Sequence, residues 1–174
     1  MIELLILYVI LKRDYTMYAI QRRIEESFAP FTKPSFGALK PALRRLEERY
    51  CLTTRKLMSD GGKLSVFYEI SKNGINELKR LMLEDLSANP LQYLSNARIK
   101  LSCADCLDSE EKKRLFFLLK SRAMQFKNDA QNILSDEYKQ VNFYQKVILD
   151  NAICEYSNFI NIIEGLEKDN ARNS

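Results

Sequence analysis

Lysine and arginine side chains gather in residues 35–49 at spacings that bring them to one side of a helix. If this segment is wound at about 100° per residue, Leu39, Leu43 and Leu46 form one narrow apolar stripe of the kind that rests on a core. The opposite side carries small residues near its start and charged residues further on: Gly37, Pro41, Arg44, Arg45 and Glu48, with Lys40 beside them. Small residues permit close approach to a DNA groove, where cations meet phosphate or guanine. We therefore expect a DNA recognition helix.

The first turns of a recognition helix reach deepest into the groove, and this determines the expected contacts. For base edges we expect Ser35, Phe36, Lys40 and Arg44. For phosphates we expect Thr32, Lys33, Arg45, Tyr18 and Lys63. For several of these residues a purely structural role is the alternative to DNA contact. Arg44 and Arg45 could pair with Glu48 on a solvated face. Tyr18 could belong to the core, and Phe36 could only staple the helix start.

Most residues that would support catalysis are missing. The chain has no histidine and only five glycines, which excludes Ser-His and Cys-His pairs and leaves no Gly-rich loop for phosphate. Cys103 and Cys106 have the spacing of a redox motif, but a zinc site would need two further ligands. We expect both to be small semi-buried residues near a helix end, with a thiol sensor as the alternative. We expect no enzyme, no cofactor and no metal site.

The composition is that of a globular protein with a local excess of positive charge. Its 174 residues suit one ordinary domain or two small ones. Residues 1–86 hold 15 Lys and Arg against 11 Asp and Glu, whereas residues 87–174 hold 12 of each, so the excess lies in the half expected to meet an anionic partner. No run of about 20 apolar residues predicts a membrane span. The apolar start Ile2–Leu11 lacks a cleavage site, and we interpret it as a buried helix of a cytoplasmic protein.

The first 86 residues carry the signals of a winged helix-turn-helix in order. Helices are predicted over residues 2–12, from an N-cap at Thr16 to Phe28, and from Ser35 to Arg49. Residues 14–16 break the pattern between the first two helices, and Pro30 and Pro34 separate the second from the third. Strands are predicted over Thr53–Met58 and Leu64–Ile70, joined by a Gly-Gly turn. A fourth helix opens at Ser71 and carries an apolar edge to Leu86.

The remaining residues are predicted to be helical. Three helices are expected, from Pro90 to about Leu101, from a capping box of Asp108 and Glu111 to about Leu134, and from about Asn142 to Leu166. The last two form an antiparallel hairpin whose apolar stripes need a covering surface. This surface is either the N-terminal domain of the same chain or, as we favour, the same hairpin of a second chain. The predicted fold class is mainly α, with a winged helix-turn-helix domain over residues 1–86 and a helical dimerisation domain over residues 87–174.

Several short motifs, spread through the N-terminal domain, carry a family resemblance. They are Tyr18-Ala19-Ile20, Pro34-Ser35-x-Gly37-x-Leu39-x-Pro41-Ala42-Leu43-x-Arg45-Leu46-Glu47, Gly61-Gly62 and Phe67-Tyr68-x-Ile70-Ser71-x-x-Gly74. In these residues the chain resembles the PadR family of bacterial transcriptional regulators, and the similarity weakens after residue 90. The resemblance implies a homodimer that sets two recognition helices in adjacent major grooves of double-stranded DNA, about 34 Å apart. It also implies a repressor, released in some members by aromatic acids or hydrophobic drugs.

Four positions depart from the pattern of that family. Met17 stands where a glycine is usual, and Lys40 replaces an aromatic residue of the recognition helix. Tyr50 stands where a glycine commonly ends the helix, which predicts a positive φ there. Lys63 is the single charge after the wing glycines, where a basic cluster is common, so we expect contacts from the helix to dominate.

The predicted function is a PadR-like repressor whose operator binding responds to a small hydrophobic or aromatic effector. Aromatic candidates for effector binding at a dimer interface are Tyr8, Phe116, Phe117 and Tyr156. Two alternatives stay open. One is a winged-helix sensor of small molecules that has lost DNA binding, and the other is a protein-interaction module that uses the C-terminal helices alone.

Overall fold

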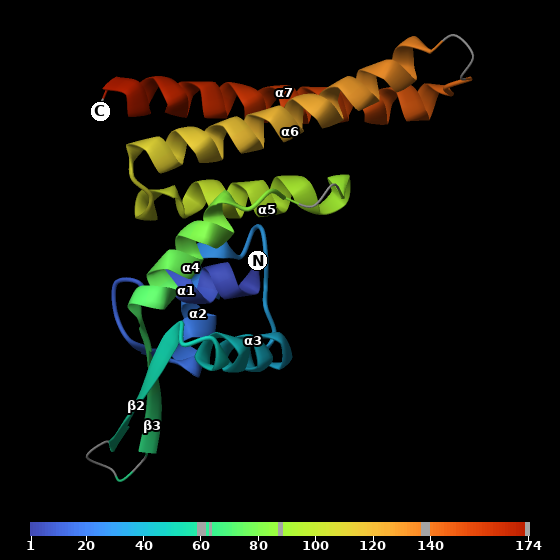
Figure 1. Ribbon diagram of the computed structural model, residues 1–174. Coiled ribbons are helices and arrows are strands. Elements are labelled where there is room, and N and C mark those ends of the chain that lie inside the picture. The colour runs from blue at the N-terminus through green and yellow to red at the C-terminus, as the bar shows by residue number, and fades with distance from the viewer. Residues whose placement is uncertain (59–61, 63, 87–88, 137–139, 173–174) are drawn as a thin grey trace. The chain divides into compact units, whose positions relative to one another are not determined.

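Two compact units make up the chain. Its computed structural model (Figure 1) describes residues 1–58, 62, 64–86, 89–136 and 140–172. The first unit comprises Met1–Glu84 and Leu91–Cys106, and the second comprises Asp85–Pro90 and Leu107–Ser174. The helix that begins at Pro90 is thus grouped mainly with the N-terminal elements, although the sequence assigns it to the C-terminal domain. The division into a DNA-binding domain and a dimerisation domain stays a prediction.

The first unit is built around α1 (Ile2–Ile10), whose buried side chains are Leu4, Leu5, Ile6, Leu7 and Ile10. This helix packs against α2 (Met17–Phe28), α3 (Phe36–Glu48) and α4 (Lys72–Leu83). A helix that is apolar nearly all round has to be surrounded in this way. It ends at Ile10, before the expected residue 12, because the N–H of Leu11 turns back to the carbonyl of Tyr8 and tightens the last turn.

The predicted N-caps Thr16 and Ser35 are confirmed, and Ser71, where a fourth helix is predicted to open, also acts as an N-cap. The side-chain oxygens of Thr16, Ser35 and Ser71 accept hydrogen bonds from the backbone N–H groups of Ala19, Ala38 and Gly74, at 3.3, 3.3 and 3.0 Å. Each bond satisfies one of the backbone donors that the first turn of a helix leaves free. The starts of α2, α3 and α4 are therefore determined locally by these caps.

A small antiparallel sheet of order β1-β3-β2 completes the wing. Its strands are β1 (Tyr15–Thr16), β2 (Leu52–Met58) and β3 (Leu64–Ile70). The two predicted strands are confirmed, with Thr54 opposite Tyr68 in register. The interpretation of residues 14–16 as a break is incomplete, because Tyr15 also pairs with Tyr68. A two-residue strand has no periodicity of its own, and only its partner defines it.

The segment after α3 makes a tight connection to the wing and to α4. Tyr50 adopts φ 56°, which confirms the predicted positive φ. Ser71 donates its hydroxyl to the Tyr50 carbonyl at 2.7 Å and its N–H to the Cys51 carbonyl at 3.1 Å. Gly74 has to be glycine here, because a Cβ atom would lie 2.2 Å from that Cys51 oxygen. The helix α4 ends at Leu83, short of the expected Leu86, because Glu84 is extended.

Two further elements belong to the N-terminal unit for most or all of their length. They are α5 (Pro90–Ser102) and the 3-10 turn η1 (Ala104–Cys106). Lys100 of α5 is 3% exposed, and its ammonium group donates to the carbonyl of Glu84 at the end of α4. This buried bond ties α5 to the winged-helix elements, since an unpaired buried ammonium would be costly.

The second unit is an antiparallel hairpin of α6 (Ser109–Ser135) and α7 (Phe143–Arg172), which lie side by side in Figure 1. The predicted capping box is confirmed. Asp108 accepts from the Glu111 N–H at 2.9 Å, and Glu111 accepts from the Asp108 N–H at 3.0 Å. The helix α7 continues to Arg172, beyond the expected Leu166. The prediction stopped too early because the polar last turns of the helix carry no apolar pattern. Among the described residues, no helix has the length and apolar character needed to cross a membrane.

Candidate nucleic-acid interface

The helix α3 separates into a buried stripe and an exposed face, as its sequence predicts. Leu39, Leu43 and Leu46 are each at most 1% exposed, and the small Ala42 is buried beside them. The remaining positions of the first three turns face solvent: Phe36, Gly37, Ala38, Lys40, Pro41, Arg44 and Arg45. Pro41 lies inside a continuous helix, although it lacks the N–H that would bond toward Gly37. The exposed face therefore offers small residues near its start and cations along its length.

Two contacts from α2 fix the start of α3. Gln21 donates its side-chain amide to the Pro34 carbonyl at 3.2 Å. The rings of Tyr18 and Phe36 meet edge to face, with centroids 4.9 Å apart. Tyr18 is 69% exposed, so the interpretation of this tyrosine as a core residue is wrong. The connection between the helices is longer than a minimal turn, and these contacts hold it in place.

The two cations expected to reach bases differ in their surroundings. Arg44 is 81% exposed, and its Nε lies 2.8 Å from Oε1 of Glu48, one turn later. This pair uses Nε, and the terminal Nη1 and Nη2 groups bond to no other described residue. They are therefore available to donate two parallel hydrogen bonds, which is what guanine accepts. Lys40 has no hydrogen bond or ion pair with any other described residue. Lys40 and Arg44, with Pro41, Glu47 and Tyr68, line a shallow cavity of about 410 Å³ between α3 and β3.

Arg45 forms an ion pair with another helix of the first unit. Its Nε lies 2.7 Å from Oε1 of Glu3 in α1, and Arg49 binds the other oxygen of the same carboxylate. Arg49 also contacts Glu77 of α4 at 2.7 Å. The hydrogen bond from Arg80 lowers the pKa of Glu77, and the charges of Arg80 and Arg49 add to this against the opposing effect of burial. The network joins α1, α3 and α4, so Arg45 has a structural role beside its predicted phosphate contact.

The other residues expected to contact phosphate are spread over two segments. Thr32 is half-buried in the α2–α3 connection, where its N–H bonds to the Phe28 carbonyl at 2.9 Å. Lys33 follows it and is exposed. Lys63 lies outside the described residues.

The wing carries two cations that the sequence reasoning overlooked. Arg55 and Lys56 lie on β2, whose residues from Thr53 to Met58 are all exposed. Arg55 pairs with Asp14 at 2.9 Å. Lys56 has no such partner among the residues that the structure describes. Their signal is two adjacent cations within the predicted strand Thr53–Met58, before the wing glycines.

The comparison with protein families covers the elements that carry this surface. Residues 6–80 match the transcriptional regulator PadR-like family. This part of the chain belongs to the PadR-like family. The matched residues reach from α1 into α4 and include α3 and the wing, which confirms the resemblance drawn from the motifs. Residues 6–80 therefore match the part of PadR-like transcriptional regulators that holds α3 and the wing.

Solved structures of similar proteins cover the chain more fully but with low identity. PadR of Bacillus subtilis in complex with operator DNA is 16% identical, with 97% of this chain and 98% of that chain covered and a TM-score of 0.47. The PadR-like regulator BC1756 of Bacillus cereus is 18% identical, with full coverage of both chains and a TM-score of 0.43. The protein smu.1604c of Streptococcus mutans UA159 is 18% identical over 94% and 96%, with a TM-score of 0.46. The sequence matches no curated protein.

The four aromatic residues proposed for effector binding do not share one described cavity in this PadR-like chain. Tyr8 belongs to the first unit and donates its hydroxyl to Asp105 at 2.8 Å. Burial, with this bond and the charge of Asp105, raises the pKa of Tyr8. It lines a cavity of about 300 Å³ together with Lys12, Tyr15, Arg23 and other residues. In the second unit Phe116 and Tyr156 are buried, whereas Phe117 is 65% exposed.

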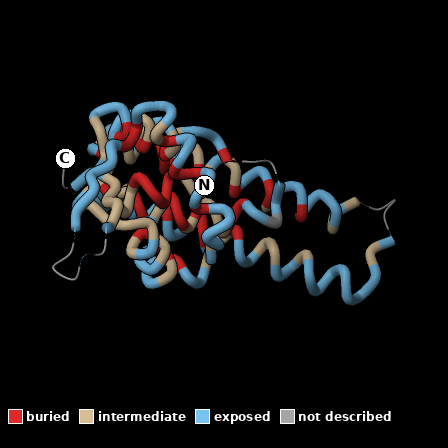
Figure 2. The backbone as a smooth tube through the Cα atoms, turned by 90° about the horizontal axis from the view of Figure 1, so that it is seen from below, coloured by how far each residue is buried: buried red, intermediate tan, exposed pale blue. Residues whose placement is uncertain are grey.

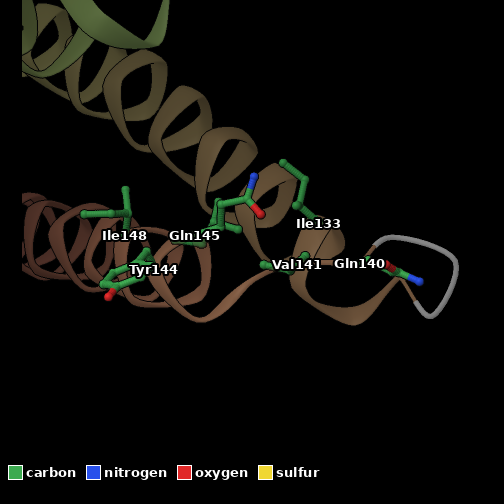
Figure 3. Close-up of a pocket in the computed structure, with 7 residues that line it drawn as sticks. Ile133, Gln140, Val141, Tyr144, Gln145 and Ile148 are labelled. Atoms are coloured by element: carbon green, nitrogen blue, oxygen red, sulfur yellow. The ribbon is translucent and has the colours of Figure 1, made fainter.

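The hairpin of the second unit has an apolar pocket of its own. Its volume is about 700 Å³ (Figure 3), and it is lined by Ile133, Gln140, Val141, Tyr144, Gln145, Ile148 and Leu149. None of these residues was singled out from the sequence. The sequence pattern offers little indication of this pocket, because α7 carries apolar side chains on several sides at its start and no single face stands out.

Cys103 and Cys106 have the surroundings of packing residues. Cys103 is fully buried, and burial raises the pKa of its thiol, which keeps the thiolate scarce at neutral pH. Cys106 is half-buried in η1, and all four cysteines are free thiols. This supports the interpretation of Cys103 and Cys106 as packing residues over the thiol sensor. Among the described residues, no group of three or more Cys, Asp or Glu side chains is arranged to hold a metal ion.

Proposed function

We propose that this PadR-like regulator represses transcription by binding operator DNA through the first turns of α3. The observation that carries the proposal is the exposed face on which Lys40 and Arg44 follow a capped helix start, opposite a fully buried leucine stripe. A helix fixed in this way presents its cations at a defined depth and angle. Neither a catalytic group nor a cofactor is needed for this role.

The proposed contacts divide into positioning and reading. Lys33, Thr32 and the free backbone N–H groups that follow Ser35 face the phosphates, because the start of a helix favours anions. Lys40 and Arg44 read base edges from the groove. The wing adds Lys56 and Lys63 as further phosphate contacts. Arg45 contributes less than the sequence suggests, because Glu3 already neutralises it.

We further propose that two copies of the chain bind the operator as a homodimer through residues 87–174. The support is a set of exposed apolar side chains on α6 and α7, most pronounced at the start of α7: Phe117, Met124, Phe143, Tyr144, Val147, Ile148 and Ile162. In Figure 2 the end of the hairpin is mostly exposed. Patches of this kind mark interaction sites on soluble proteins. A twofold arrangement would cover the same surface on both copies.

An effector would act on this assembly by changing the geometry of the dimer. The apolar pocket of about 700 Å³ beside Tyr144 and Ile148 is the proposed site for a small hydrophobic or aromatic molecule (Figure 3). The volume lies within the range of pockets that hold small molecules. The cavity beside Tyr8 is the smaller alternative.

The test is a fluorescence anisotropy titration of the full chain with duplexes that tile the DNA flanking its own gene. We expect one duplex to bind at least tenfold more tightly than a shuffled duplex of equal composition, with an affinity that falls steeply with salt. The double variant Lys40→Ala/Arg44→Ala should abolish the preference, whereas Arg22→Ala/Arg23→Ala on α2 should retain it. Equal binding to all duplexes, or no binding at all, would refute the proposal and favour the sensor that has lost DNA binding.

The dimer and the effector are tested separately from DNA binding. Mass measurement by light scattering decides whether the chain is a dimer. Titration of candidate aromatic acids into the protein–duplex complex decides whether a ligand releases it. A response to the ligand that is lost in Tyr144→Ala, with DNA binding retained, supports the hairpin pocket.

A further inference from the structure

Two exposed aromatic rings meet at the DNA-facing end of α3. Phe36 is the first residue of that helix, and Tyr18 lies in the first turn of α2. Their ring planes cross at 63°, which is the edge-to-face arrangement that aromatic pairs prefer. Phe36 nevertheless stays 40% exposed. A hydrophobic staple would use the residue before the N-cap, and Phe36 follows the cap Ser35, so stapling does not explain its position.

The position of the Phe36 ring is set by the backbone on both sides of the contact. Thr16 caps the helix that carries Tyr18, and Ser35 caps the helix that carries Phe36. The bond from Gln21 to the Pro34 carbonyl joins α2 to the residue that precedes the cap Ser35. A phenyl ring also has few torsions to lose when it binds. Phe36 is therefore a rigid apolar contact point.

The chemistry of the major groove restricts what such a ring can recognise. Guanine, cytosine and adenine present hydrogen-bond donors and acceptors at their edges, and thymine alone adds an apolar group, its 5-methyl. Phe36 has no polar side-chain atom with which to satisfy the other edges. Lys40 lies one turn further along the same exposed face and supplies polar recognition there.

We infer that Phe36, held in place by Tyr18, contacts the 5-methyl group of a thymine in the operator. The inference rests on the proposed DNA binding, and it assigns a base preference to one residue of that surface. Tyr18 acts as a positioning residue. Its hydroxyl has no hydrogen bond with another described residue and is placed to reach the neighbouring phosphate.

The experiment removes the methyl group and leaves every hydrogen bond of the base pair in place. A duplex is first selected from a random pool by the wild-type chain. Each of its thymines is then replaced singly by deoxyuridine, and affinities are measured by fluorescence anisotropy. We expect one thymine in each half-site to lose about fourfold in affinity, the scale of one buried methyl group. The other thymines should tolerate the change.

The same scan on protein variants assigns that loss to a residue. In Phe36→Ala the sensitive thymine and its deoxyuridine counterpart should bind equally, whereas Phe36→Leu, which keeps an apolar side chain, should still distinguish them. Tyr18→Ala should weaken the distinction, because the ring of Phe36 loses its support. Ile75→Ala on α4 is the matched control, since Ile75 is 38% exposed and lies outside this surface. It should behave as the wild type does.

The outcomes separate this inference from the proposed function. A wild-type chain that binds its selected duplex but tolerates deoxyuridine everywhere overturns the role of Phe36 and leaves the DNA-binding proposal intact. A thymine preference that persists unchanged in Phe36→Ala also overturns it, because another residue then reads the methyl group. Failure to select any duplex contradicts the proposed function itself.

Discussion

Arg44 combines an ion pair on its own helix with donors that are free to bind a base. Its Nε contacts Glu48 at 2.8 Å, and the pair is exposed, so the pair itself adds at most about 0.5 kcal/mol to stability. Loss of a bidentate contact to guanine costs about 1–3 kcal/mol. We therefore expect Arg44→Ala to weaken specific binding about tenfold and to flatten the preference at one base pair. Titration against duplexes changed at single positions measures both effects.

Arg22 is the matched control for this change. It forms an ion pair with the same i, i+4 spacing to Glu26 at 3.5 Å and is 70% exposed, but it lies on α2 and not on α3. Arg22→Ala should leave both affinity and base preference unchanged. If Arg44→Ala behaves like Arg22→Ala, then Arg44 belongs to an ordinary solvated face.

Gly74 shows how closely two backbones approach at the start of α4. A Cβ atom there would lie 2.2 Å from the Cys51 carbonyl oxygen and 2.7 Å from Cγ1 of Ile70. Backbone cannot give way as a flexible side chain does, so we expect Gly74→Ala to lower the free energy of unfolding by about 1–3 kcal/mol or more. Gly165→Ala in α7 meets no atom within 4 Å and should instead stabilise by about 0.5–1 kcal/mol. Urea denaturation followed by circular dichroism compares the two, and equal effects would contradict the steric explanation.

At the scale of elements, the carboxylate of Glu77 bonds α4 to α3. Its side chain is 13% exposed, and its oxygens lie 2.7 Å from Arg49 and from Arg80. The pKa of Glu77 is lower in the folded chain than its ordinary value near 4.5, chiefly through the hydrogen bond from Arg80. The stabilisation is therefore fully present above that ordinary value. It is lost as the pH falls from there through the lowered pKa of the folded state.

This gives a prediction for stability as a function of pH. At neutral pH, Glu77→Gln should lower the free energy of unfolding by about 1–3 kcal/mol, because two guanidinium groups lose a charged acceptor. The difference from the wild type should shrink as the pH is lowered below about 4.5. Glu26→Gln, whose carboxylate is 48% exposed, should show almost no difference at either pH. Urea denaturation at a series of pH values measures this difference in unfolding free energy. A difference that does not change with pH would mean that the charge of Glu77 contributes nothing and that only the packing of its side chain does.

The elements themselves could largely be predicted from the sequence, because caps and periodicity act locally. Thr16, Ser35, Ser71 and Asp108 each bond within the first turn that they start, so their sequence context is sufficient. The strand β1 could not be predicted, since its two residues become a strand only beside β3. The ends of α4 and α7 were also missed, because helix ends depend on packing and on polar turns that carry no pattern.

The candidate site was predictable to a similar extent and for the same reason. The exposed face of α3 follows from the spacing of its leucines. The pairing of Arg45 with Glu3 does not, because the two residues are far apart in the chain and meet only after α1 and α3 pack. The contact between Tyr18 and Phe36 is hidden in the same way. Residues that act through one helix can be found from spacing, whereas those that join two helices need the fold.

At the scale of the whole molecule, the start of α7 is the surface through which we propose that two copies meet. Tyr144 and Ile148 are one turn apart, 78% and 66% exposed, and both line the apolar pocket of the hairpin (Figure 3). Because apolar burial drives association, we expect the full chain to be a dimer at micromolar concentration. A carboxylate at this surface would have to lose its hydration on association. We therefore expect Ile148→Glu to raise the dimer dissociation constant by about tenfold or more.

The measurement is sedimentation equilibrium over a range of protein concentrations, with the same samples titrated against the selected duplex. A monomeric variant holds one recognition helix, so it should keep the base preference of a half-site but lose the added affinity that two linked half-sites provide. Ile75→Glu on α4, a change of the same kind at another exposed isoleucine, should alter neither mass nor affinity. If Ile148→Glu remains dimeric, the two copies meet through another surface. If it is monomeric and yet binds the whole operator as tightly as the wild type, dimerisation is not what positions the two recognition helices.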